Sequence, residues 1–229
     1  MPTGKITAIA AQAHDSQRVN LFVEGAFALG ISLTTLAREG LFVGKELDEA
    51  GWARLEAAAQ AEKAMLAAGR LLDARPRSAA ELRQRLRRKQ FPPEAVEQAV
   101  ERLGELGLLD DAAFSRYWVE SRQSGRPRGR LALRDELRRK GVARDTIEQA
   151  LAEADAEAPP DAERERAEQV ARAALRRYAD SPDRASFQRR LGGLLQRRGF
   201  SLDVIRPILA ILWSELQATK DQGPETNGA

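Results

Sequence analysis

The chain of 229 residues contains no cysteine and a single histidine, His14. Disulfide bonds and thiolate metal sites are therefore impossible, and a metal cluster built from histidines is excluded as well. No stretch approaches the roughly 18 consecutive apolar residues of a membrane-spanning helix. The N-terminus also lacks the basic segment and apolar run of a secretion signal. We therefore expect a soluble, cytoplasmic protein with no membrane contact.

Catalytic motifs are missing too. The chain has no Walker-type phosphate loop and no pairing of a nucleophile with a base. Asp110 and Asp111 are adjacent carboxylates, but no further ligand cluster accompanies them, and a role for Asp110 at a helix start explains the pair better. His14 lies in a polar turn and is assigned no catalytic role. We predict a protein that is not an enzyme and needs no cofactor or metal.

Basic charge is concentrated in the middle of the chain. The net charge is +3, yet residues 75–140 contain 17 basic and 10 acidic side chains, whereas 1–74 contain 7 and 9, and 141–229 contain 13 and 15. Arginine heavily outnumbers lysine, and its planar guanidinium favours bidentate contacts to phosphate or carboxylate. A coding sequence of high GC content would also enrich arginine and alanine, so composition alone does not establish a partner.

The first forty residues predict a small antiparallel β segment. Lys5–Ala10, Arg18–Val23 and Phe27–Ile31 are β-prone runs separated by polar turns. Such a segment is too small to be stable alone, so we expect it to pack on the first helices. Leu33–Arg38, followed by Gly40, predicts a short helix that ends at the glycine.

From Asp48 onward the pattern is helical, and one segment occurs three times. The copies are residues 82–100, 133–151 and 191–209, which are 51 and 58 positions apart. Each copy places apolar residues four apart, then a short turn, and then apolar residues at three-and-four spacing. The pattern predicts a helix, a tight turn and a second helix in every copy.

The turns share one capping pattern. We expect the helix after each turn to be capped by Pro92, Ala143 or Ser201. The residue before each cap and the residue five positions further on form a hydrophobic staple; the pairs are Phe91 with Val96, Val142 with Ile147, and Phe200 with Ile205. Three copies that follow one pattern are hard to obtain by chance.

Each helix pair is preceded by another helical stretch, so the unit is predicted to have three helices. The expected fold is mainly α, with tandem three-helix repeats in an elongated, curved array after the β segment. The predicted parts are a β-rich segment at 1–47, repeats at 48–106, 107–154 and 162–218, an acidic proline-containing linker at 155–161, and a disordered tail at 219–229. We expect Tyr117 and Trp118 to pack in the core, although aromatic rings can also stack on bases.

Three motifs resemble the RecX family of regulatory proteins, which modulate the RecA recombinase. The first is Leu-Arg-x-x-Leu-Arg-Arg-Lys-Gly-Val at 133–142, with a related copy at 82–91. The second is Leu-Gly-Leu-Leu-Asp-Asp-Ala-Ala-Phe at 106–114, and the third joins Trp-Val-Glu-Ser-Arg at 118–122 to Arg-Pro-Arg-Gly at 126–129. The resemblance covers roughly residues 50–215. Gln90 departs from the glycine of the other two copies, and Gly192 and Gly193 stand where arginine or an acid is expected.

The resemblance implies a function that composition does not show. Members of the family bind RecA, along its filament on single-stranded DNA or at the filament end, and suppress ATP hydrolysis and strand exchange. Such an activity modulates recombination and DNA repair. The partners implied for this chain are the RecA filament and, by weak or indirect contact, the backbone of single-stranded DNA. We expect a monomer.

The candidate partner-binding residues are basic side chains at helical spacing in the first two repeats and in the loop before the second pair of helices. They are Arg83, Arg87, Arg88, Lys89, Arg122, Arg126, Arg128, Arg130, Arg134, Arg138, Arg139 and Lys140. Each group could form a face directed at phosphate or acidic protein, or the cations could simply complement a helix dipole. The stiff Arg126-Pro127-Arg128-Gly129 loop is the best single candidate, and its alternative role is a connector between helices.

A helix-turn-helix protein that reads a DNA sequence is the alternative function, because the repeated pair has the right shape. Its recognition helix would follow the turn. That helix opens with Glu94 and Glu97 in the first copy and with Asp145 and Glu148 in the second, and these carboxylates would repel phosphates. We therefore favour contact with protein and DNA backbone over the reading of bases.

Overall fold

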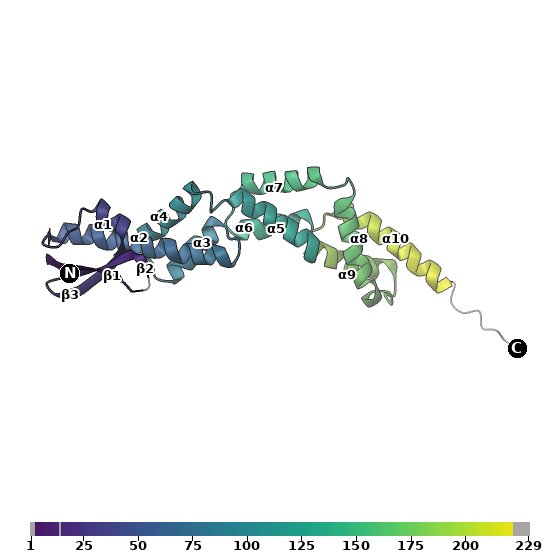
Figure 1. Cartoon of the computed structure of the whole chain (residues 1–229). Helices are drawn as coiled ribbons and strands as arrows, with labels where there is room; N and C mark the ends of the chain where they lie inside the picture. The colour runs from purple at the N-terminus through teal and green to yellow at the C-terminus, as the bar shows by residue number, and fades with distance from the viewer. Residues whose placement is uncertain (1–2, 14, 222–229) are drawn as a thin grey trace. The chain divides into compact units, whose positions relative to one another are not determined.

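The structure is a computed structural model that describes residues 3–13 and 15–221 (Figure 1). The chain forms two compact units, residues 1–110 and 111–229. The first unit joins a β-sheet to helices, and the described part of the second unit is helical without strands. The prediction of a mainly α protein with a small antiparallel β segment at its start is confirmed.

An antiparallel sheet begins the first unit. Its strands are β1 (Gly4–Gln12), β2 (Asp15–Val23), β3 (Ala26–Ser32) and β4 (Glu46–Leu47), in the order β3-β2-β1-β4. The first three strands contain the predicted β runs. The sequence does not predict β4, because this short strand has no alternating pattern and exists only through its pairing with Gly4 and Lys5.

One face of the sheet is buried against the first half of α2 (Glu49–Ala74). Buried residues alternate along β2 and β3, as the period of two in a strand requires, and Leu21 and Ile31 are fully buried. Trp52 and Leu55 of α2 complete this cluster. The sheet, too small to be stable alone, therefore takes its core partner from the helix that follows it.

Glu62 of α2 holds the short helix α1 (Leu33–Arg38) in place. Its carboxylate accepts hydrogen bonds from the Ser32 backbone N–H at 3.0 Å and from the Ser32 and Thr35 hydroxyls. Arg18 lies 3.3 Å from the same carboxylate. Burial alone would raise the pKa of Glu62, but these hydrogen bonds, with the positive charge of Arg18, lower the pKa below its ordinary value.

The second half of α2 belongs to a different core, that of the first three-helix module. Ala64 and Ala68 are fully buried there, and their small side chains let α4 (Pro93–Glu105) approach closely. Leu82 and Leu86 of α3 (Ala79–Arg88) fill the remaining space. One continuous helix thus contributes to two separate hydrophobic clusters.

The second unit repeats this three-helix arrangement twice (Figure 1). The second module contains α5 (Asp111–Gly125), α6 (Arg130–Arg139) and α7 (Arg144–Glu157). The third contains α8 (Ala162–Ala174), the 3-10 turn η1 (Leu175–Arg177), α9 (Arg184–Arg197) and α10 (Leu202–Asp221). Each module has its own buried apolar cluster, which confirms the tandem repeat.

The predicted turn recurs in all three modules. Pro92 and Ala143 cap α4 and α7, and Ser201 precedes α10, as expected. The staple partners lie in the core of each module, and four of them, Val96, Ile147, Phe200 and Ile205, have at most 2% of their surface exposed. The chain reverses at Gln90, Gly141 and Gly199, with φ angles of 65°, 76° and 85°. Glycine adopts this left-handed conformation without strain, whereas glutamine does not.

Three boundaries differ from the prediction. Helix α7 continues to Glu157, so residues 155–157 of the predicted linker are helical, because alanine and glutamate favour helix. Helix α10 continues to Asp221, into the predicted tail; residues 222–229 lie outside the described residues, as does His14. Strand β2 begins at Asp15, before the start of the predicted β run at Arg18–Val23.

Trp118 and Tyr117 have different environments. Trp118 packs against the core of the second module, as predicted. The prediction for Tyr117 is wrong, because 46% of its surface is exposed. Consecutive helical residues point about 100° apart, so the two neighbouring rings could not both face the core.

Candidate functional site

The predicted basic residues of the first module lie along α3 and its C-terminal end. Arg83 and Arg87 share one carboxylate, Glu97 of α4, with nitrogen–oxygen distances of 2.7 and 3.1 Å. The hydrogen bond from Arg83 is the main reason why the pKa of Glu97 is lowered. Arg88 and Lys89 contact no carboxylate in the described part of the chain and are exposed.

The second module has a similar group, in which the glutamate and one of the two arginines are at equivalent positions. Glu148 of α7, which is 51 residues after Glu97, lies 2.6 Å from Arg134 and 3.3 Å from Arg130. Arg130 also pairs with Asp155. The hydrogen bond from Arg134 is the main cause of the lowered pKa of Glu148. Each of the first two modules therefore presents a surface group of two arginines and one glutamate.

Glu136 of α6 organises a second group of predicted residues. Its carboxylate accepts hydrogen bonds from the Trp118 indole N–H and from Arg122, both at 2.9 Å, and lies 3.4 Å from Arg128. Glu136 is largely buried, with 15% of its side chain exposed. Arg122 and Arg128 thus help to fix the α5–α6 connection, which agrees with the connector role considered for this loop.

Cations cover the indole of Trp118. The Arg122 guanidinium lies 4.3 Å and the Lys140 ammonium 4.1 Å from the ring centroid. Both distances are within the range of a cation–π interaction. These contacts, and the packing of Trp118 against the core of the module, favour a structural role for the ring over stacking on a base.

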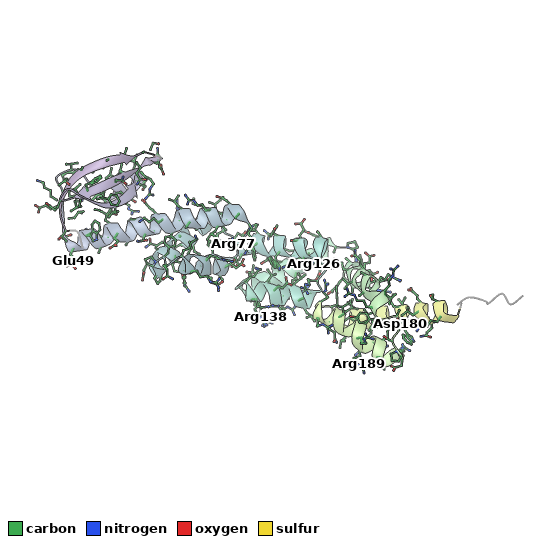
Figure 2. All side chains as sticks on the ribbon, turned by 90° about the horizontal axis from the view of Figure 1, so that it is seen from below. Glu49, Arg77, Arg126, Arg138, Asp180 and Arg189 are labelled. Atoms are coloured by element: carbon green, nitrogen blue, oxygen red, sulfur yellow. The ribbon has the colours of Figure 1, made fainter. Side chains whose placement is uncertain are left out.

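Three predicted arginines remain at the surface of the second module. The side chain of Arg138 is 76% exposed and pairs with Asp135 at 3.2 Å (Figure 2). Arg139 donates to the backbone oxygen of Asp135. Arg126, in the loop after α5, is exposed and contacts no carboxylate among the described residues. The loop therefore combines one unpaired guanidinium with the structural Arg128.

The surface pairs do not remove these arginines from binding. An exposed ion pair contributes about 0.2–1 kcal/mol to stability, and phosphate or carboxylate of a partner can replace the internal acid at little cost. Meanwhile Glu97 and Glu148 hold two guanidinium groups in fixed positions on each module. The arrangement suits an anionic partner and contains no group of three or more His, Asp or Glu that could hold a metal ion within residues 3–13 and 15–221.

Sequence reasoning missed a second copy of the arginine loop. Arg75-Pro76-Arg77-Ser78 precedes α3 as Arg126-Pro127-Arg128-Gly129 precedes α6, at the same offset of 51 residues. Ser78 is fully buried and caps α3 by accepting a hydrogen bond from the Glu81 backbone N–H. Comparison of the residues before each repeated segment would have found the copy.

The loop of the second module is also joined to the turn of the third. The Gly129 backbone N–H donates to the Arg198 carbonyl at 2.9 Å, and the Leu131 N–H donates to the Gly199 carbonyl at 3.1 Å. A Cβ atom on Gly129 would lie 2.3 Å from the Gly199 oxygen, so only glycine permits this approach. The sequence gives no sign of this junction, because the two segments are 70 positions apart.

No described helix is both long enough and apolar enough to span a membrane.

Helix α5 begins directly after Asp110, at the position where the sequence predicts a helix start.

Four family models match the chain. They are described as the RecX N-terminal domain, at residues 4–48, and the first, second and third three-helix domains of RecX, at 64–103, 110–151 and 161–209. Together the models account for the sheet and the three helical modules.

Curated relatives and solved structures agree with these matches. A protein named regulatory protein RecX from Mycobacterium avium is 40% identical over 67% of this chain and 84% of its own length. One of the same name from Bacillus pumilus is 29% identical over 95% and 81%. A crystal structure of regulatory protein RecX, 29% identical, covers 89% of this chain and 98% of its own with a TM-score of 0.76. RecX from Lactobacillus salivarius, 22% identical, shares the fold with a TM-score of 0.58 over 67% of this chain and 96% of its own.

Proposed function

Because the chain belongs to the RecX family of regulatory proteins, we propose that it binds the RecA recombinase on single-stranded DNA and inhibits ATP hydrolysis and strand exchange. By that inhibition it would modulate recombination and DNA repair in the cytoplasm. The chain acts as a monomeric binding protein with no catalytic step of its own.

The repeated pairing of two arginines with one glutamate is the observation that best supports this function. Glu97 and Glu148 are at equivalent positions, and so are Arg83 and Arg134, so the first two modules present similar anion-binding surfaces; the second arginine of each group comes from a different position. A filament of identical subunits on regularly spaced phosphates offers matching anionic groups at intervals. Arg88, Lys89 and Arg126 add cations without internal partners among the described residues.

Reading of a DNA sequence is less well supported. Glu97 and Glu148 lie on the helices that would have to enter the major groove. Both carboxylates accept hydrogen bonds from arginines of the preceding helix. Those helices therefore present carboxylates and paired guanidinium groups rather than free donors for base edges. A footprint on one duplex sequence that is absent on scrambled DNA would favour this alternative.

The decisive experiment titrates the chain into RecA on single-stranded DNA and measures ATP hydrolysis. We expect a saturable decrease in the rate, and no hydrolysis by the chain alone. An unchanged rate at saturating chain concentration would contradict the proposal. ATP turnover by the chain alone, abolished by substitution of a single acidic residue, would indicate an enzyme instead.

A further inference from the structure

We propose that a pocket in the second unit binds a short acidic protein segment through one apolar side chain and its flanking carboxylates. The pocket has a volume of about 360 Å³. It lies between the loop after α5, helix α8 with η1, and the C-terminal end of α9. None of the residues that line it is acidic.

The floor of the pocket is apolar. It is formed by Pro127, Val170, Ala173, Ala174 and Leu194. The volume lies at the lower end of the range for sites that enclose a small ligand, which suits one aliphatic or aromatic side chain. A partner residue placed there would cover apolar surface that is now in contact with water.

Three arginines surround this floor. Arg126 comes from the loop of the second module (Figure 2), Arg177 from η1, and Arg198 from the turn after α9. Arg126 and Arg177 are exposed and Arg198 is half-buried. None of the three guanidinium groups contacts a carboxylate in the described part of the chain. This distinguishes them from the arginines paired with Glu97, Glu136 and Glu148.

The walls of the pocket are held together before any partner arrives. The carbonyl of Arg198 accepts a hydrogen bond of 2.9 Å from the backbone N–H of Gly129. Gly129 is three residues after Arg126. The close contact of Gly129 with Gly199 fixes the two segments side by side. Binding therefore loses little conformational entropy of the backbone, which favours even a short ligand.

A protein segment fits this chemistry better than nucleic acid or a simple anion. A guanidinium presents a planar pair of donors that matches a carboxylate. Binding of single-stranded DNA usually uses exposed aromatic rings for base stacking, and no aromatic residue lines the pocket. The nearby Tyr178 packs in the core of its module under Arg190. An inorganic anion would leave the apolar floor uncovered.

The inference deepens the proposed function and depends on it only for the identity of the partner. The paired arginines of the first two modules suit phosphates, and the pocket would supply a separate contact with protein. Recognition of acidic motifs by clustered arginines is a recurrent mode of peptide binding.

The test measures binding of a fluorescein-labelled peptide, one leucine flanked on each side by two acidic residues, to the full chain by fluorescence anisotropy. We expect saturable binding that R177A/R198A weakens about tenfold or more. The matched control R176A/R197A removes the same charge from adjacent positions that do not line the pocket, and should change the affinity by less than about twofold. A peptide with glycine in place of leucine should also bind about tenfold more weakly.

Three results would overturn the proposal. The first is no binding of the peptide to the unchanged chain, and the second is an equal loss of peptide affinity in R177A/R198A and R176A/R197A. The third is a loss of affinity for labelled oligodeoxythymidine in R177A/R198A that is at least as large as the loss for the peptide. The last result would identify a nucleic-acid site. Circular dichroism of each variant verifies folding, and Arg177→Lys with Arg198→Lys, which keeps charge without the planar fork, should recover only part of the affinity.

The proposed function has a separate readout in the same variants. Peptide binding that depends on the pocket, with no inhibition of recombinase ATPase by the unchanged chain, would support the pocket and reject the function. Inhibition of recombinase ATPase by the unchanged chain, without peptide binding, would support the function and reject the pocket.

Discussion

Gln90 is the residue at which the three modules differ most clearly in backbone strain. It has a φ of 65°, in the position where the other modules have Gly141 and Gly199. Left-handed conformation is unfavourable for a residue with a Cβ atom by about 1–2 kcal/mol, and part of this is offset by the greater freedom of glycine in the unfolded chain.

We expect Gln90→Gly to raise the free energy of unfolding of the first unit by about 1 kcal/mol. Urea unfolding followed by circular dichroism measures this change. The matched change Gly141→Gln should lower the stability of the second unit by a similar amount. Destabilisation by Gln90→Gly would mean that the glutamine side chain, not the backbone conformation, controls this turn.

Glu62 predicts how the first unit responds to acid. Its pKa in the folded chain is lower than in the unfolded chain, so its contribution to stability is fully present above the unfolded value and is lost as the pH falls. We expect acid to destabilise the unchanged chain more than Glu62→Gln, from about pH 4.3 downward. Parallel acid dependence of unfolding in both proteins would show that the hydrogen bonds from Ser32 and Thr35 do not stabilise the ionised carboxylate.

At the scale of the elements, the junction between Gly129 and Gly199 determines whether the last two modules form one unit. A Cβ atom on Gly129 would overlap the backbone of the facing turn. We expect Gly129→Ala to destabilise the second unit by about 1–3 kcal/mol and to increase hydrogen exchange at Leu131. Gly125→Ala is the control, because a Cβ there meets no atom within 4 Å. Equal stability of the two variants would exclude a close junction.

Local patterns predicted much of the secondary structure, whereas contacts between distant elements were not predictable. The staple pairs are only five residues apart, so the sequence itself contains the information for the turn. Glu97 is 14 residues from Arg83, and its ion pairs with two arginines depend on how α3 packs against α4. The twelve candidate residues could be recognised from the sequence as basic side chains on helices and in one loop, but their division into paired and unpaired groups follows from this packing.

At the scale of the whole molecule, the basic charge of residues 75–140 should govern inhibition of the recombinase. We expect alanine at Arg126, Arg128, Arg138 and Arg139 to raise the concentration for half-inhibition of RecA ATPase about tenfold or more while helicity is retained. Inhibition should also weaken as salt is increased. Recombinase ATPase at two salt concentrations measures both effects.

A control for this variant replaces Arg54, Arg70, Arg164 and Arg184 by alanine. These four arginines are exposed and lie outside the set of candidate residues. Because each variant removes four arginines, the net charge changes by the same amount in both. Unchanged inhibition by the first variant, or equal weakening by both, would remove the central arginines from the binding surface.

Helix α2 makes the sheet and the first module mutually dependent. Its first turns present Trp52, Leu55 and Ala59 to the sheet, and later turns present Ala64 and Ala68 to α3 and α4. Deletion of the strands would expose the side chains of Trp52 and Leu55 on helix α2 to water. Such an apolar surface patch would promote aggregation. A shortened chain would need to begin its first helix near residue 60, or carry polar side chains at positions 52, 55 and 59.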